Sequence, residues 1–168
     1  MRVIGVDPGT AITGWGIVEG EGNDLRLVAC GVINTLAGTP LPQRLAVIYQ
    51  GLVEIIHQWQ PKSAAIEELF FSRNAKTAMT VGQGRGVAIL ALVHANLSIV
   101  EYKPLEVKQA VTGYGGADKM QMQQMVKLLL SLDDIPRPDD AADALAVAIC
   151  HLHSARLRLL ESATSDSN

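Results

Sequence analysis

The sequence predicts an α/β fold, in which a mixed five-stranded sheet (three antiparallel strands, then two parallel ones) is flanked by helices. Three observations support this fold class. Three strand-like segments joined by short links lie within the first 34 residues. A helical apolar periodicity then begins at Leu41. Beyond it, two short apolar segments alternate with helical ones, an order that is typical of parallel strands.

Three strands are predicted near the N-terminus. Residues 2–7 (RVIGVD) contain β-branched side chains and no polar alternation before Asp7, which is typical of a buried strand. Residues 13–19 alternate small or polar with large apolar side chains, and EGEGND then forms a turn. Residues 25–33 form the third strand, and the short links predict an antiparallel meander.

The rest of the chain is mostly helical. Apolar residues at three- and four-residue spacing predict an amphipathic helix over 41–60, which ends at Pro61. Asp118 is the expected N-cap of a later helix. The polar residues 160–168 are expected to form a disordered tail. The other predicted elements are a strand at 63–67, a loop at 69–76, a helix to about Leu97, a strand at 98–102, and helices at 104–112, 119–131 and about 139–159.

Composition limits the classes of protein that fit. The 168 residues fit one domain, and a hydrophobic fraction of 48% is enough for a core. No apolar run reaches the ~18 residues that a membrane span needs. The N-terminus lacks the layout of a signal peptide, so a cytoplasmic location is expected. Cys30 and Cys150 lack the spacing of metal ligands and are expected to be buried thiols.

Charge is unevenly distributed along the chain. The formal net charge of −3 disfavours a nucleic-acid partner at first sight. Between Lys62 and Lys127, however, there are eight basic residues and five acidic ones, so the local net charge is 8 − 5 = +3. This middle part of the chain therefore suits an anionic partner, and metal ions held by acidic residues would make its field more positive.

Four acidic residues are expected to converge. Asp7 and Glu67 end two predicted strands that become neighbours if strands 1 and 4 pair. Asp140 and Asp143 are three residues apart, so they project from one face of the last helix, with Cβ atoms roughly 5–6 Å apart. The apolar face of that helix should pack on the sheet and bring its first turn toward the two strand ends.

Such a cluster predicts a metal site. Converging carboxylates raise each other's pKa values, and divalent cations relieve that repulsion. Oxygen ligands without His or Cys suit Mg²⁺ or Mn²⁺. Two such ions ~3.5–4 Å apart support hydrolysis of a phosphodiester. The four His residues have no ligand spacing toward these acids and are interpreted as structural.

Each acid also has an ordinary explanation by itself. Asp7 suits the turn DPG, and acids in the first turn of a helix favour its dipole. Asp139, which follows Pro138, is the better N-cap of the last helix. Strand alternation sends Glu67 and Glu68 to opposite faces, and the residues alone do not decide which one faces the site. One shared site explains the combination better than four independent explanations.

Five motifs resemble one known family over residues 2–157. They are VDPGTAITGWG, IEELFFSRNAKTAM, GQGRGVAI, EVKQAVTGYGGADK and DDAADALAVAI. Together, in this order, they resemble the RuvC family of Holliday-junction resolvases. The resemblance implies a ribonuclease-H-like nuclease domain over residues 1–159 and a homodimer. It also implies symmetric nicking of four-way DNA junctions in recombination and repair, leaving 5′-phosphate and 3′-hydroxyl ends.

The resemblance assigns roles to individual residues. The catalytic, metal-binding acids of the family fall on Asp7, Glu67 (in preference to Glu68), Asp140 and Asp143. They would hold two Mg²⁺ ions per active site, with Mn²⁺ as a substitute. The aromatic residue near the junction centre falls on Phe70, with Phe71 as the alternative. The loop lysines fall on Lys108 and Lys119. The implied partners are a branch-migration complex, made of a junction-binding tetramer and a hexameric ATPase motor.

Other residues suit contacts with DNA on chemical grounds. Phe70 adjoins Arg73, Asn74 and Lys76, and an aromatic ring beside polar and basic residues suits base stacking or wedging. The ordinary alternative is that both phenylalanine rings are core. Lys108 and Lys119 lie near the glycine-rich TGYGGA loop and suit phosphate contacts, although single lysines are usually solvated surface residues. Tyr114 suits either DNA contact or packing.

Three glycines inside a predicted helix need a separate explanation. Gly82, Gly84 and Gly86 cost helix stability, so they suit close packing of another helix, including one across a dimer. A phosphate loop is a weaker interpretation, because no strand precedes them. Arg85, which lies among them, suits either an ion pair across that interface or a contact with DNA.

Two other classes of function remain open from the residues. VDPGTAITGWG also resembles the phosphate-binding hairpin of actin-like ATPases and sugar kinases, which need two such domains. The third class is a non-catalytic DNA-binding module on the same fold, which would not need all four acids.

Overall fold

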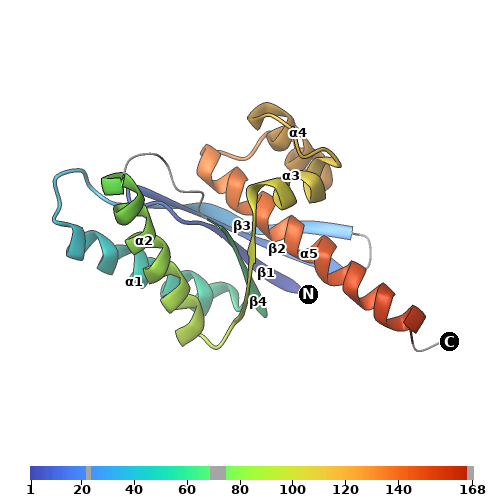
Figure 1. The fold of residues 1–168 in the computed structure, drawn as a ribbon, viewed down its shortest axis with the longest axis horizontal. Coiled ribbons are helices and arrows are strands. Elements are labelled where there is room, and N and C mark those ends of the chain that lie inside the picture. Colours follow the sequence, from blue (N-terminus) through green and yellow to red (C-terminus); the bar gives the residue numbers. More distant parts are fainter. Residues whose placement is uncertain (22–23, 69–74, 166–168) are drawn as a thin grey trace.

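The chain forms one mixed sheet with helices on both faces (Figure 1). The computed structural model describes residues 1–21, 24–68 and 75–165, and it does not describe the side chains of 75–77 and 156–165. The strand order is β3-β2-β1-β4-β5, antiparallel for β1–β2 and β2–β3 and parallel for β1–β4 and β4–β5. The predicted mixed sheet is therefore confirmed. The strands are β1 (Arg2–Asp7), β2 (Ile12–Glu21), β3 (Asp24–Asn34), β4 (Ser63–Glu67) and β5 (Ser98–Tyr102).

Local signals explain where several helices begin and end. Pro104 opens α3 at a position that needs no backbone N–H. Asp118 caps α4, as predicted: its Oδ1 accepts a hydrogen bond from the backbone N–H of Gln121 at 2.8 Å. Gln60 ends α1 in the left-handed conformation, at φ 49°. The helices are α1 (Leu41–Trp59), α2 (Ala75–His94), α3 (Pro104–Thr112), α4 (Lys119–Leu129) and α5 (Asp139–Ser165).

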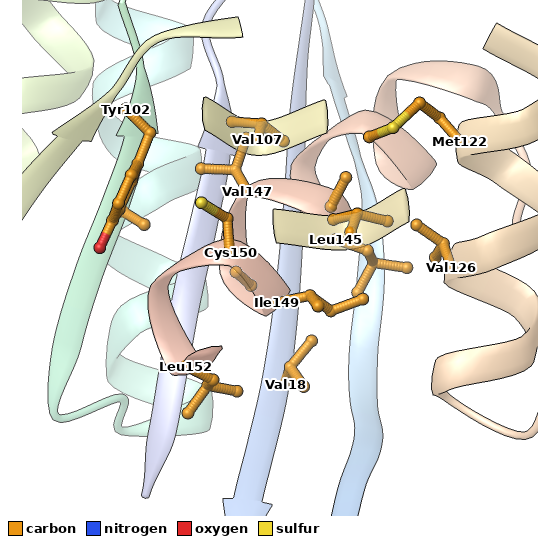
Figure 2. Close-up of a cluster of buried hydrophobic side chains, with 14 of the residues drawn as sticks. Val18, Tyr102, Val107, Met122, Val126, Leu145, Val147, Ile149, Cys150 and Leu152 are labelled. Atoms are coloured by element: carbon orange, nitrogen blue, oxygen red, sulfur yellow. The ribbon is translucent and has the colours of Figure 1, made fainter. Parts of the chain in front are cut away.

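The two faces of the sheet carry separate cores. Helices α1 and α2 cover one face, where Ile4 and Val6 of β1 meet Ile48 and Leu52 of α1. Helix α5 covers the other face, with α3 and α4 packed on its outer side (Figures 1 and 2). Alternate residues of β1 therefore belong to different layers. Asp7 has the parity of Val3, which belongs to the α5 core.

Two expectations need correction. Helix α5 continues to Ser165 rather than ending near Leu159, so residues 160–165 are helical and not a disordered tail. The physical reason is that no Gly or Pro follows Pro138 and the segment contains several Ala, Leu and Arg residues, which are good helix formers. Helix α2 begins at Ala75, inside the loop predicted over 69–76. Within the described residues, no helix has both the length and the apolar character needed to span a membrane.

Candidate active site

The sheet places Asp7 and Glu67 side by side. Strands β1 and β4 are parallel neighbours, and Val6 pairs with Ile66, so each acid follows a paired residue at the same edge. Glu67 has the same parity as Ala65 and Ser63, which face α5. Both carboxylates therefore point to the face that α5 covers. This arrangement confirms that strands 1 and 4 are neighbours.

Glycines of the sheet let α5 approach closely. A Cβ at Gly14, the residue paired with Asp7 across β1 and β2, would lie 2.0 Å from the carbonyl oxygen of Asp140. A Cβ at Gly5 would lie 2.1 Å from the carbonyl oxygen of Ala144. Any side chain at these positions would push the helix outward. The first turn of α5 therefore rests directly on the backbone opposite Asp7.

The carboxylates influence one another electrostatically. Burial, followed by the charges of Glu67, Asp143 and Asp140, raises the pKa of Asp7 to about 7. Burial, followed by the charge of Asp143, also raises the pKa of Glu67. Burial raises the pKa of Asp143, although Lys119 opposes that shift. Three of the four predicted acids thus carry more repulsion and desolvation than the protein's own cations offset.

Two predicted lysines lie at the same site. A hollow of about 240 Å³ is lined by Glu67, Asp143, Lys108 and Lys119, together with apolar residues of α3, α4 and α5. The ammonium group of Lys119 lies 3.5 Å from Asp143 Oδ2 and 3.1 Å from Asp139 Oδ2. The charge of Lys108 opposes the rise in the pKa of Glu67 that burial and Asp143 cause. The sheet, α3, α4 and α5 therefore bring both lysines to the acids.

The site suits a hard divalent cation by its donor chemistry. Its ligands would be carboxylate oxygens, and the raised pKa of Asp7 reflects burial first and then the negative charges around it. As the side chains stand, no three His, Cys, Asp or Glu residues of the described part of the chain are arranged to hold a metal ion. Asp143 is instead engaged by Lys119.

Comparison with known proteins identifies the family. The family model described as "Crossover junction endodeoxyribonuclease RuvC" matches residues 3–151. The chain belongs to the RuvC family. RuvC of Chloroflexus aggregans is 61% identical over 155 residues, which cover 92% of this chain and 94% of that protein. RuvC of Pelotomaculum thermopropionicum is 57% identical over 153 residues, which cover 91% of this chain and 93% of that protein.

Solved RuvC structures share the fold. A structure of Thermus thermophilus RuvC is 38% identical with a TM-score of 0.85, and the alignment covers 94% of this chain and 96% of that one. The same protein in complex with a Holliday junction substrate is 37% identical, with the same coverage and a TM-score of 0.89. The ribonuclease-H-like fold predicted from the RuvC resemblance is therefore confirmed.

The structure does not describe the side chains of several residues that were predicted to bind DNA. Phe70, Arg73 and Asn74 lie outside the described residues, as does the alternative Phe71. Lys76 lies in α2, but its side chain is not described. Their DNA contacts therefore stay predictions.

Two features near the RuvC acids differ from the sequence-based expectation. Asp139 is the first residue of α5 rather than its cap, and its carboxylate forms ion pairs with Lys119 and Arg137. The hydrogen bond from Lys119 lowers the pKa of Asp139. Gly84 packs against Thr10, whose Oγ1 would lie 3.2 Å from an added Cβ, so this glycine serves contact within the chain.

Arg85, for which the sequence suggested an ion pair across a dimer or a DNA contact, instead contacts residues near the site within its own chain. Its Nε donates a hydrogen bond to the carbonyl oxygen of Glu67 at 3.3 Å, and its guanidinium forms an ion pair with Glu101. The backbone N–H of Glu68 donates to the carbonyl oxygen of Tyr102 at 2.8 Å. The backbone that follows β4 is thus held from α2 and from β5. The only sequence signal was the position of Arg85 among the glycines of α2.

Proposed function

We propose that this RuvC-family protein is a crossover junction endodeoxyribonuclease that resolves four-way (Holliday) DNA junctions with two Mg²⁺ ions. One observation carries the proposal: half-buried carboxylates from two strand ends and one helix converge, and burial followed by the charges of the other three raises the pKa of Asp7 to about 7. Family membership supports the substrate, because Thermus thermophilus RuvC has been solved with a Holliday junction. The two phosphodiester bonds are cut symmetrically, leaving 5′-phosphate and 3′-hydroxyl ends.

Asp7, Glu67, Asp140 and Asp143 are the proposed ligands of the metal pair. Bound divalent ions would supply an activated water and stabilise the leaving oxygen, and Mn²⁺ would substitute for Mg²⁺. Asp7 is proposed as the central ligand, because the charges of Glu67, Asp143 and Asp140 all act on its carboxylate. To hold a metal ion, Asp143 would give up its ion pair with Lys119, whose ammonium group would keep its closer partner, Asp139.

The lysines and the segment after β4 are the proposed contacts with DNA. Lys108 and Lys119 line the hollow beside Glu67 and suit the charge that develops on the scissile phosphate. Phe70 is proposed to stack on a base at the opened junction, supported by Arg73, Asn74 and Lys76. The position of Glu67 supports this role, because the segment begins next to a proposed metal ligand.

The exposed face of α2 supports a homodimer. Met79, Leu90 and Val93 are exposed there, and they share a helical stripe with Gly82 and Gly86. An added Cβ at either glycine would meet no atom within 4 Å, so a second helix can approach the bare backbone. A dimer would provide two active sites for the two cuts. The remaining proposed partners are a junction-binding tetramer and a hexameric ATPase motor, and the proposed location is the cytoplasm.

The two other functional classes are not favoured. An ATPase of the actin-like or sugar-kinase type would leave the acids of α5 without a role. A non-catalytic DNA-binding module would not need four carboxylates at one point. Relatives that are 61% and 57% identical are crossover junction endodeoxyribonucleases.

Cleavage of a synthetic four-way junction tests the proposal. In Mg²⁺, the wild-type protein should cut the junction and leave a linear duplex of the same sequence intact. Asp7→Asn should lower the cleavage rate by at least about 10³-fold, because several kcal/mol of transition-state stabilisation are lost. Its affinity for the junction should stay within a few-fold of wild type. Normal cleavage by Asp7→Asn, or ATP hydrolysis without cleavage, would contradict the proposal.

A further inference from the structure

A second hollow adjoins the acid cluster. It has a volume of about 520 Å³, and Asp140 is one of its lining residues. The loop after β1 and the start of β2 form one wall with residues 9–12, α1 contributes Arg44, and α2 contributes Thr80 and Val81. The first hollow contains Asp143 and Glu67 but none of these residues. The acids of α5 therefore line two different depressions.

Arg44 is held in place at this second hollow. Its Nε donates a hydrogen bond to Thr35 Oγ1 at 2.7 Å, and that hydroxyl donates to the carbonyl oxygen of Thr10 at 2.6 Å. Thr10 Oγ1 in turn donates to the carbonyl oxygen of Thr80 at 2.9 Å. This chain of bonds ties α1, the end of β3, the loop after Asp7, and α2 together.

The anchoring uses one nitrogen of the guanidinium. A guanidinium has five N–H donors, and Nε carries one of them. Across the described part of the chain, the bond to Thr35 is the one hydrogen bond that the Arg44 side chain makes, and Arg44 forms no ion pair. A rigidly held fork with unused donors is the geometry that binds phosphate oxygens in a bidentate manner.

We propose that the second hollow binds a backbone phosphate of the DNA strand being cut, and that Arg44 is its ligand. Among the described residues that line the hollow, Arg44 is the one cation, so a DNA backbone complements its charge. The apolar wall of Ala11, Ile12 and Val81 suits the sugar beside that phosphate. Asp140 connects the hollow to the acid cluster, which places the bound phosphate next to the one that is hydrolysed. The inference rests on the proposed junction cleavage and adds a binding residue to it.

An alternative role for Arg44 is purely structural. In that case the arginine only tethers Thr35 and the loop after Asp7, and no phosphate reaches it. The two roles differ in the salt dependence of DNA binding. Each phosphate contact that is lost reduces the slope of log K against log salt by about 0.9 for duplex or about 0.7 for single-stranded DNA. Loss of a tether leaves the slope unchanged.

The test measures binding of a fluorescent synthetic four-way junction by the full chain in EDTA, so that no cleavage occurs. Affinity is measured from about 50 to about 200 mM NaCl for each variant. Arg44→Ala and Arg44→Gln should weaken binding about tenfold and reduce the slope by about 0.7–0.9. Arg44→Lys, which keeps the charge, should retain the slope.

Two control variants separate charge from structure. Thr35→Val removes the hydroxyl that anchors Arg44 but keeps the guanidinium, so its slope should equal that of wild type. Arg26→Ala removes an exposed arginine from the opposite end of the sheet and should change neither affinity nor slope. Thermal unfolding verifies that each variant is folded. If Arg44→Ala does not fold, Arg44→Gln serves as the variant without the charge.

Three outcomes would overturn the inference. It is wrong if Arg44→Ala and Arg44→Gln keep the wild-type slope, or if Thr35→Val reproduces their whole effect. In both cases the wild-type protein still binds the junction, so the proposed function stands. If the wild-type protein shows no preference for the junction over linear duplex in binding or cleavage, the proposed function and the Arg44 contact fail together.

Discussion

The carboxylates near the two ends of strand β1 lie in opposite electrostatic environments. At its start, Glu19 of β2 lies between Arg2 and Arg26, and the hydrogen bond from Arg26 holds the pKa of Glu19 below its usual value. At its end, burial and neighbouring acids raise the pKa of Asp7 to about 7. The charge of Glu19 is therefore balanced by arginines of the same chain, whereas Asp7 is repelled by the acids around it. Such a cluster costs stability and is retained where function requires it.

The largest effect on stability is expected at Gly14, whose missing side chain allows α5 to pack against the sheet. Gly14→Ala should lower the free energy of unfolding by about 3 kcal/mol, because the new Cβ would lie 2.0 Å from a backbone oxygen of Asp140. Cleavage should fall as well, since α5 must move away from Asp7. Gly84→Ala is the matched control, because the nearest atom to an added Cβ there is a side-chain oxygen of Thr10, at 3.2 Å. Equal stability of Gly14→Ala and wild type in urea denaturation would contradict the close approach.

The next effect concerns the pH dependence of stability. In the folded protein Asp7 keeps its proton up to about pH 7, whereas its ordinary pKa is 3.8. Between these values the folded state binds more protons than the unfolded state, so the free energy of unfolding falls as pH rises. Without metal, wild type should lose on the order of 3 kcal/mol relative to Asp7→Asn between about pH 4 and about pH 7.5.

Urea denaturation of both proteins across this pH range measures that difference. Added Mg²⁺ should restore part of the lost stability of the wild type at neutral pH, because the ion binds the folded state. Asp7→Asn should respond less. A stability difference that does not change with pH would show that Asp7 is not under the repulsion described above.

A smaller effect is expected where α2 holds the end of β4. Arg85→Ala should lower stability by about 1–2 kcal/mol, since it removes a partly buried hydrogen bond to Glu67 and an ion pair with Glu101. It should also weaken Mn²⁺ binding in calorimetry, because Glu67 loses its support. Glu101→Gln leaves the bond to Glu67 in place and should have the smaller effect. Unchanged Mn²⁺ affinity in Arg85→Ala would rule out a positioning role.

The smallest effect on stability is expected at the end of the sheet where Glu19 pairs with Arg2 and Arg26. Arg26→Ala removes an exposed arginine from the group around Glu19, and exposed ion pairs contribute little. The midpoint of thermal unfolding should change by less than about 2 °C, and added salt should reduce the change further. A large decrease would mean that this end of the sheet also depends on charge.

Many of the strand and helix boundaries were predictable from the sequence, because they depend on residues that are close together along the chain. The bounds of β1, β4 and β5 agree with their apolar segments, and the cap at Asp118 follows from its own turn. The neighbouring positions of Asp7 and Glu67 followed from topology. Other features depend on contacts between distant residues. Nothing near Arg85 in the sequence indicates that it reaches the carbonyl oxygen of Glu67, and nothing near Lys119 indicates its contact with Asp143.

The sequence by itself determined which residues end the strands and which share a face of α5, because strand alternation and helical spacing depend only on neighbours along the chain. The tertiary structure decided how close those residues come. Gly5 and Gly14 admit α5 to the backbone of the sheet, and that contact raises the pKa of Asp7 by burial and repulsion. Burial and repulsion between distant residues are properties of packing, so they appear only when the sheet and α5 are assembled.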